Sequence, residues 1–462
     1  MHPKDLSIKD FSYDLPDERI AKYPLAERDL SKLLIYNGSG TDEESTKQTQ
    51  TIAASKQEIT APIQKESTSA KTSAAFRSKI SQSSYRNIFE VVPEGSLLVF
   101  NNTKVVEARI LFQKPSGATI EIFCLEPDDR YPDITTAMLQ SGKLWWKCLV
   151  GGAKKWKEPL LTKTILQGDK KILLNAERKD QIEDYYLIEF NWDDNSLSFA
   201  EILHAAGLIP LPPYLNRTAE TSDLDRYQTI YAKYDGSVAA PTAGLHFTDT
   251  IFEKLATKNI SKEYLTLHVG AGTFKPVKAE KIEDHDMHAE FIEVRIDFIQ
   301  KLIDQISKQG LILDSTHLPS FKSPKIIPVG TTSMRTIESL YWLGVKTILN
   351  RDIKLIDLVV HQWDPYNIDA VGISATSALT ALLNWMQNNE TELLITKTQI
   401  IIAPGFDFKI AQALITNFHQ PQSTLLLLVS ALIGDDWKKV YQYALDNDFR
   451  FLSYGDGCYL SK

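Results

Sequence analysis

Two stretches in the middle of the chain place glycine, threonine and histidine at the ends of apolar runs. Residues 237–248 read SVAAPTAGLHFT, and residues 265–276 read LTLHVGAGTFKP. Glycine lets the backbone approach a ligand closely, and imidazole titrates near neutral pH, so both suit a site that moves protons. Taken singly, either segment also fits a β-bulge or a helix start that carries a core histidine. Because both occur together, they predict a polar site.

A candidate anion site follows the apolar run at 326–329. The sequence GTTS at 330–333 comes next, and Arg335 lies in the first turn of the helix expected at 334–342. Free amide groups at a helix start, hydroxyl groups and a guanidinium favour an anion. No P-loop pattern occurs, so a carboxylate or a single phosphate is favoured over a nucleoside triphosphate. An ordinary capped helix is the alternative.

His285 and His288 in EDHDMHAEF are three residues apart. Two imidazoles at this spacing can share one face of a helix and bind a metal, so a metal-dependent hydrolase is one alternative function. The H-E-x-x-H motif and the motif of zinc deaminases are both absent. We therefore expect acid–base or hydrogen-bonding histidines and no metal site.

Two further loops carry polar groups near the C-terminal end of the sequence. His419 lies between the expected strand at 413–416 and an apolar helix, and Asp456 lies between two glycines after a short strand. Either residue could be structural. Polar groups at strand ends of an α/β sheet are nevertheless where such folds usually bind ligands.

A basic and aromatic stretch spans residues 143–157. Its cations are Lys143, Lys147, Lys154, Lys155 and Lys157, interleaved with Trp145, Trp146 and Trp156. Lysines neutralise phosphates and aromatic rings stack on unpaired bases, so the stretch is compatible with RNA binding. The alternative is a solvated strand face with core tryptophans. The net charge of −8 does not by itself indicate a nucleic-acid partner.

The bulk composition is that of a globular protein. The chain has 462 residues with 43% hydrophobic content, which is enough for two or three domains. No secretory signal is visible, and the longest apolar stretch, 424–433, is short of the roughly 20 residues that a membrane span needs. The three cysteines are widely spaced, without a C-x-x-C motif, which fits a reducing cytosol. We expect a cytoplasmic monomer that does not contact a membrane.

The order of the expected elements predicts an α/β main domain with a mixed sheet and an inserted small all-β, barrel-like domain. Residues 1–103 form the first part of the main domain, 104–198 the inserted domain, and 199–462 the remainder. Residues 38–84 read as a mobile polar insertion, and 344–396 as a second insertion. Further expectations are a strand at 398–403 and a helix from Asp297 that ends at Gly310.

Ten segments, in order along the chain, carry a family resemblance. They are YDLPDERIAKYPLAERD, LLVFNNTKV, LIPLPPYLNR, DRYQTIYAK, SVAAPTAGLHFT, TLHVGAGTFKPV, HDMHAEF, PVGTTSMRTIES, TNFHQPQSTLLLLVSA and FRFLSYGDG. The chain resembles the S-adenosylmethionine:tRNA ribosyltransferase-isomerase family of queuosine biosynthesis. The resemblance covers most of the chain outside the two insertions.

The resemblance implies a transferase and isomerase that acts on tRNA. Such an enzyme moves the ribosyl part of S-adenosylmethionine onto 7-aminomethyl-7-deazaguanine at the wobble position of the anticodon. The products are epoxyqueuosine in tRNA, adenine and methionine, and no cofactor is needed beyond the co-substrate. The alternatives are the metal-dependent hydrolase and a catalytically silent tRNA-binding protein.

The chemistry of this reaction and the residue types together give our site candidates. A sulfonium makes the neighbouring C5′ hydrogens acidic, so the site needs a base, and it needs a donor for the departing adenine. The acid–base candidates are His246, His268, His285 and His288, with Asp456 as an orienting carboxylate. The substrate-binding candidates are Thr242, Gly244, Gly270, Gly272, Thr273, Phe274, Tyr214, Thr331, Thr332, Ser333, Arg335, Asn417 and His419. The RNA-binding candidates are Lys104 and the five lysines of 143–157.

Two sets of the substrate-binding candidates are assigned a specific contact with S-adenosylmethionine. Residues 331–333 and Arg335 are expected to hold the methionine carboxylate. Phe274 and Tyr214 are expected to face the sulfonium through cation–π contact.

Overall fold

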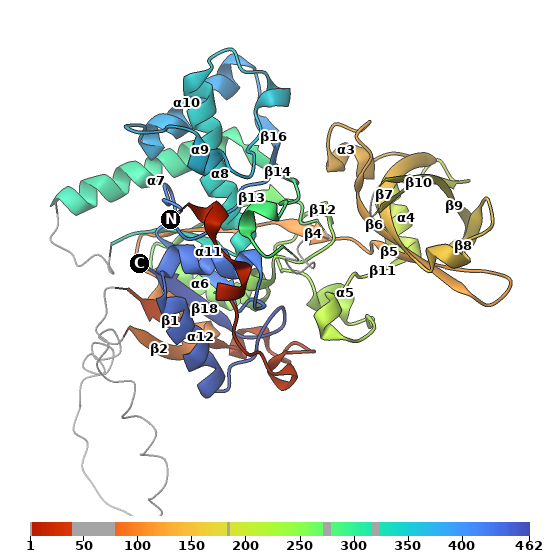
Figure 1. Cartoon of the computed structure of the whole chain (residues 1–462), viewed down its shortest axis with the longest axis horizontal. Coiled ribbons are helices and arrows are strands. Elements are labelled where there is room, and N and C mark those ends of the chain that lie inside the picture. The colour runs from red at the N-terminus through yellow and green to blue at the C-terminus, as the bar shows by residue number, and fades with distance from the viewer. Residues whose placement is uncertain (1, 39–78, 183–184, 271–278, 316–322) are drawn as a thin grey trace, which may run out of the picture.

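The computed structural model describes residues 2–38, 79–182, 185–270, 279–315 and 323–462. The described chain forms two lobes, each built on its own β-sheet (Figure 1). The larger lobe contains a nine-stranded sheet and the smaller a seven-stranded sheet, and a two-stranded ribbon lies between them. The mixed sheet and the α/β character predicted from the sequence are confirmed.

The nine-stranded sheet has a parallel centre and antiparallel flanks. Its order is β16-β14-β13-β3-β15-β17-β18-β1-β2. Neighbours among β13, β3, β15 and β17 are parallel, whereas β14 and β18 pair antiparallel with the outer members of this group. Parallel strands end at one edge of the sheet, so their carboxyl ends converge there. The strands are β1 (Lys32–Asn37), β2 (Ile80–Ser84), β3 (Leu97–Asn101), β13 (Ser261–Leu267), β14 (Glu290–Arg295), β15 (Ile326–Val329), β16 (Leu393–Thr398), β17 (Ala413–Asn417) and β18 (Gly457–Ser461).

Helices cover both faces of this sheet because its central strands are apolar on both sides. In β3, Leu97 and Val99 join one buried cluster, while Leu98 and Phe100 join another on the opposite face. The first cluster includes side chains of α7 (Ile296–Ser315), α8 (Thr331–Leu349), α10 (Ala375–Asn388), α11 (Thr424–Ile433) and α12 (Asp436–Asp446). The second includes α2 (Ile88–Val91) and α6 (Asp249–Thr257). No helix of the described residues is long and apolar enough to cross a bilayer.

The seven-stranded sheet is antiparallel throughout and curls around one helix. Its order is β11-β5-β6-β7-β10-β9-β8, so β11 and β8 are edges and the sheet is an open half-barrel (Figure 1). Phe199 of α4 (Phe199–Ala206) packs on Trp146, Phe190 and Trp192 inside the curl. The strands are β5 (Arg109–Gln113), β6 (Thr119–Pro127), β7 (Lys143–Gly151), β8 (Leu161–Gln167), β9 (Lys170–Ile182), β10 (Tyr185–Trp192) and β11 (Gly207–Leu208).

The ribbon between the lobes consists of β4 (Thr103–Val105) and β12 (Tyr234–Ser237), which pair in parallel. The short helix α3 (Ile134–Met138) of the smaller lobe packs against β12. Residues 239–243, which follow β12 directly, therefore start from the junction of the two lobes.

Part of the predicted polar insertion is a strand. Residues 80–84 form β2, which pairs antiparallel with β1 at the edge of the large sheet. The sequence ISQSS gave no strand signal because an edge strand needs only backbone hydrogen bonds, and its side chains stay partly exposed. Residues 39–78 of this insertion lie outside the described residues.

Two other expectations are wrong in detail. The apolar run 398–403 is a strand only at its first residue, because β16 ends at Thr398, and Ile400–Ala403 fill the core instead. The helix from Ile296 continues through Gly310 to Ser315. Residues 344–396, which we predicted as a second insertion, include the end of α8 and the first part of β16, which pairs with β14 in the large sheet.

Gly344 allows α8 and α10 to pack closely, and replacing it should destabilise the protein. An ideal Cβ at this position would lie 2.1 Å from the carbonyl oxygen of Ala378. We expect Gly344→Ala to lower the free energy of unfolding by about 1–3 kcal/mol in urea titrations. Gly310→Ala is the matched control, because nothing lies within 4 Å of its Cβ and alanine favours a helix by up to about 1 kcal/mol. Equal stability of Gly344→Ala and wild type would contradict close packing here.

Candidate functional site

A cavity of about 100 Å³ lies at the carboxyl edge of the large sheet, beyond β15 and β17. Its walls come from residues 239–243, 330–332 and 416–420, closed by Tyr214 and Ser453. Apart from His419, none of its described lining residues is acidic or basic. Its polar side chains are hydroxyls, the two amides of Asn417 and Gln420, and the imidazole of His419, so the cavity suits a ligand that brings its own charges.

Two helices begin at the wall of this cavity. Gly330 precedes α8 with φ of 92°, a backbone conformation that favours glycine, and its N–H donates to the carbonyl of Ile415 (2.8 Å). Ser423 caps α11 by accepting from the N–H of Leu426 (3.3 Å). Thr331 and Ser423 both line the cavity. The positive ends of the two helix dipoles therefore favour a negative group of the ligand.

Asn417 links one wall of the cavity to His246. It accepts from Thr242 Oγ1 at Oδ1 (2.8 Å), and its Nδ2 lies 3.3 Å from His246 Nε2. His246 Nδ1 lies 3.3 Å from the carbonyl oxygen of Arg28, and the ring stacks on Tyr85 with centroids 4.4 Å apart. A carbonyl accepts only, so Nδ1 carries the hydrogen and Nε2 accepts from the amide. Burial lowers the pKa of His246 to about 4, so the ring is neutral at neutral pH.

His419 and Tyr214 complete the polar part of the wall. His419 Nε2 lies 2.9 Å from Thr416 Oγ1, and burial lowers the pKa of His419 to about 3. The Tyr214 hydroxyl lies 2.5 Å from Ser453 Oγ, and burial raises its pKa to about 12. Both rings are therefore uncharged at neutral pH. The cavity thus brings together Thr242, Tyr214, Thr331, Thr332, Asn417 and His419, with His246 directly behind Asn417.

His268 lies at the junction of the lobes and not in the cavity wall. Its Nε2 lies 3.1 Å from Glu293 Oε1, which also accepts from Thr135 Oγ1 of the smaller lobe (2.9 Å). Its Nδ1 lies 3.4 Å from Thr103 Oγ1, and Gly236 leaves room for the ring. Burial opposes ionisation of Glu293, but the hydrogen bond and charge of His268 outweigh it and lower the pKa of this carboxyl.

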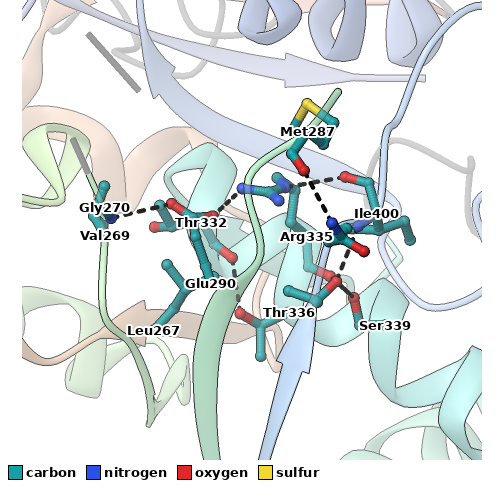
Figure 2. A network of polar contacts seen from close by, with 12 residues as sticks. Leu267, Val269, Gly270, Met287, Glu290, Thr332, Arg335, Thr336, Ser339 and Ile400 are labelled. Atoms are coloured by element: carbon teal, nitrogen blue, oxygen red, sulfur yellow. Dashed lines mark hydrogen bonds and ion pairs between the residues drawn. The ribbon is translucent and has the colours of Figure 1, made fainter. Parts of the chain in front are cut away.

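Arg335 is paired inside the protein, as Figure 2 shows. One arm contacts Glu290 in a buried ion pair, and Nε donates to the carbonyl of Ile400 (3.2 Å). Glu290 also accepts from the N–H of Gly270 (3.4 Å). Glu290 is thus the acidic partner of Arg335 in this structure, and the role of Arg335 toward a substrate carboxylate stays a prediction. The sequence could not show this, since Glu290 is 45 residues away.

Three other candidates have structural partners. The carboxylate of Asp456 accepts from the N–H groups of Lys32 (3.0 Å) and Arg450 (2.8 Å), and it contacts no histidine among the described residues. Ser333 Oγ donates to the carbonyl of Val329 (3.0 Å). A Cβ at Gly244 would lie 1.9 Å from the Tyr231 hydroxyl, so this glycine serves packing.

His285 and His288 lie in the irregular segment between η10 (Ile282–Asp284) and β14, so they do not share a helix face, as the alternative of a metal-binding pair would require. The described residues contain no group of three or more His, Cys, Asp or Glu placed to hold a metal ion. Burial lowers the pKa of His285, and the charge of His288 lowers it further. Gly272, Thr273 and Phe274 lie outside the described residues.

The predicted RNA-binding lysines are spread over the smaller lobe and the ribbon. Lys143 pairs with Glu189 (2.9 Å), and Lys147 pairs with Asp129 (3.0 Å) and Glu126 (3.1 Å). Lys104 on the ribbon pairs with Asp235 (3.2 Å). Lys154, Lys155 and Lys157 are exposed around η6 (Ala153–Lys155).

The three tryptophan rings of residues 143–157 also have partners within the protein. Trp146 and Trp156 are buried in the core of the smaller lobe. Trp145 donates to Glu189 (2.6 Å) and carries the Arg130 guanidinium 3.2 Å above its ring centre. Three of the six lysines are thus paired with carboxylates, and all three rings are buried or in contact with other side chains.

Sequence reasoning did not single out several groups that the structure places at the site. Thr416 and Ser453 line the cavity, and Glu290 and Glu293 hold Arg335 and His268. A signal existed for the two glutamates, because both interrupt the apolar strand EFIEVR. A charged residue on a buried strand needs a buried partner that pairs with its charge or hydrogen-bonds to it.

The buried histidines should make the protein less stable in acid. The pKa of His419 is about 3 when folded and 6.5 when unfolded, so only the unfolded chain takes up a proton between these values. Stability therefore falls as pH decreases below 6.5, by about 2 kcal/mol at pH 5 for this residue alone. We expect His419→Gln to reduce the loss of unfolding free energy between pH 7 and pH 5 by about that amount, measured in urea. An unchanged pH dependence would contradict a buried neutral ring.

Removing the anion from the buried ion pair should be costly. Glu290→Gln leaves the Arg335 charge without its partner, and we expect a loss of about 3–5 kcal/mol in the free energy of unfolding. Glu283→Gln is the control, because Glu283 is exposed and pairs with Lys281 at 3.4 Å, where a change below about 0.5 kcal/mol is expected. A small effect at both positions would show that the buried pair does not form in solution.

Comparison with known proteins identifies the family of the chain. The crystal structure of the S-adenosylmethionine tRNA ribosyltransferase from Thermotoga maritima matches with 24% sequence identity and a TM-score of 0.40. The match covers 97% of this chain and 99% of that one. The sequence profile of the queuosine biosynthesis protein family matches residues 68–460, which is most of the chain. The protein therefore belongs to the queuosine biosynthesis protein family.

Proposed function

We propose that this protein transfers and isomerises the ribosyl part of S-adenosylmethionine onto 7-aminomethyl-7-deazaguanine in tRNA, and that the cavity at the carboxyl edge of the large sheet binds the methionine part of S-adenosylmethionine. Family membership supports the pathway. The observation that carries the assignment of the cavity is its lining: two helix starts, hydroxyl groups and the neutral imidazole of His419, with no charged side chain among its described residues.

This lining fits a ligand with separate charges. The methionine carboxylate lies at the starts of α8 and α11, near the hydroxyls of Thr331 and Ser423. The Tyr214 ring is our candidate for contact with the sulfonium. A cavity without fixed charges repels neither the carboxylate nor the sulfonium. It also does not stabilise the sulfonium so strongly that departure of the neutral thioether is opposed.

The histidines of the site divide into two proposed roles. The reaction starts with loss of a proton from C5′, and it releases adenine, which departs more readily when protonated. His419 and His246 are neutral at neutral pH and suit hydrogen bonding to the substrate, because the burial that lowers their pKa to about 3 and about 4 opposes the uptake of a proton. His268 is our candidate for the donor, since Glu293 balances the charge of its imidazolium form.

The remaining proposals concern organisation and partners. We propose that residues 104–198 are a domain inserted into the main domain, and that the junction of the two lobes admits the anticodon loop. The partners are S-adenosylmethionine and tRNA, with no further cofactor. The protein acts in the cytoplasm as a monomer.

The reaction is tested by incubating the protein with labelled S-adenosylmethionine and tRNA that carries the aminomethyl precursor. We expect free adenine and free methionine in equal amounts, together with epoxyqueuosine in the tRNA. Adenine must not form when unmodified tRNA replaces the precursor. If no adenine forms with the tRNA that carries the aminomethyl precursor, the proposed function is contradicted.

The cavity is tested by Thr331→Val, which removes a hydroxyl from the proposed carboxylate site and keeps the shape of the side chain. We expect the KM for S-adenosylmethionine to rise roughly tenfold, because a hydrogen bond to a charged group contributes about 1.5–3 kcal/mol. Ser333→Ala is the control, since this hydroxyl lies in the same first turn but donates to Val329. Equal KM values in Thr331→Val and Ser333→Ala would remove the cavity from the proposal.

A further inference from the structure

Two arginines that form no ion pair with an acidic residue in the described part of the chain lie together beside the site. Arg28 and Arg226 come from the segments YPLAERD and DRYQTIYAK. Arg28 donates to two backbone carbonyls of residues 225–228, at 3.1 and 3.4 Å. Arg226 donates to the carbonyl of Ala26 (3.0 Å) and to that of Leu25. Each guanidinium therefore ties its segment to the other one, and only part of its five N–H groups is used.

The nearby carboxylates form ion pairs with other arginines. Glu27 and Asp29 pair with Arg86 at 2.9 and 3.1 Å. Asp223 accepts both arms of Arg217, at 2.7 and 2.8 Å. The two facing guanidiniums are thus left with carbonyl oxygens, which carry no net charge.

The two charges also oppose each other. Burial lowers the pKa of Arg28, and the charge of Arg226 lowers it further, while Tyr454 and Asp225 act in the opposite direction. Asp225 is exposed, so water screens its contribution. Nε of Arg226 is buried and has no hydrogen-bond partner in the described structure. Two like charges with an unused buried donor are better satisfied by an anion between them.

A small hollow opens at this pair. Arg28, Arg226, Ser31, His246 and Tyr454 contribute to its wall, and its volume is about 10 Å³. That is room for one group the size of a water molecule, which matches a single oxygen of a phosphate. The guanidinium fork is the side-chain geometry that phosphate recognition uses most.

The hollow is the neighbour of the cavity. Ser453 lines both, and His246 lines the hollow while its Nε2 contacts Asn417 in the wall of the cavity. One layer of side chains therefore separates them.

We propose that Arg28 and Arg226 together bind one backbone phosphate of the tRNA anticodon loop, next to the nucleotide that reacts. The inference rests on the proposed function, because it takes tRNA as the substrate. It locates the phosphate contact beside the reacting group, whereas Lys143 and Lys147 of the smaller lobe are compensated by carboxylates.

The first test measures tRNA binding without S-adenosylmethionine at 50–200 mM salt. We expect the double variant Arg28→Gln/Arg226→Gln to bind precursor tRNA at least tenfold more weakly. The slope of log Kd against log salt should decrease by about 0.7, the value for one phosphate contact to a single strand. The control is Lys170→Gln/Lys171→Gln, which removes the same charge from exposed lysines of the other lobe that are not RNA-binding candidates. An equal loss in the control, or no loss in the arginine variant, would overturn the proposal.

The second test uses the wild-type protein and does not depend on the folding of any variant. Anticodon stem-loops with one methylphosphonate at each position in turn lack a single negative charge. We expect one position to weaken binding about tenfold, and the arginine double variant, where it folds, to be insensitive to that position. Uniform binding at every position by wild-type protein would reject the phosphate contact.

The same variants separate a phosphate from the carboxylate of S-adenosylmethionine. We expect the KM for tRNA to rise and the KM for S-adenosylmethionine to stay within twofold of wild type. A rise confined to S-adenosylmethionine would overturn the assignment. If wild-type protein releases no adenine, the proposed function fails, while both binding measurements still decide the phosphate contact.

Discussion

Parallel pairing of β15 and β17 at the centre of the large sheet is the constraint on which the site depends. Val329 pairs with Ile415, and the next N–H along the chain, that of Gly330, still donates to Ile415. Both strands therefore end at the same level, and α8 and α11 begin from that edge. Two helix starts then face one small volume. An antiparallel pair would send one of these helices to the opposite edge and leave half of the anion site.

Burial determines the chemistry available at this edge. The same apolar packing that holds α8 and α11 against the sheet excludes water from His246 and His419, and it keeps both imidazoles neutral. Fixed charges are removed from the cavity by pairing elsewhere, as in Arg335 with Glu290 and Asp456 with Arg450. The cavity is left with hydroxyl and amide groups. Such groups orient a charged ligand without competing with it for the ligand's own charge.

Features that follow from the local order of residues were predicted well from the sequence. Features that depend on pairing between residues far apart in the chain were predicted poorly. A strand, a glycine and hydroxyl residues before a helix indicated the start of α8, and the histidine loops were assigned to strand ends of a mixed α/β sheet. The partner of Arg335 lies 45 residues away, and Lys143 meets Glu189 only because β7 and β10 are neighbours. No local pattern contains that information. The strand at 80–84 was missed for a related reason, because its pairing with β1 is made by the backbone alone.

Arg28 connects the two binding regions through a single residue. Its guanidinium faces Arg226 at the hollow, while its carbonyl oxygen accepts from His246 Nδ1. That hydrogen bond fixes the tautomer of His246, and the tautomer makes Nε2 the acceptor for Asn417. Asn417 in turn sets the hydroxyl of Thr242 at the cavity wall. The proposed phosphate contact of Arg28 and the protonation pattern of the cavity wall therefore depend on the same short stretch of backbone.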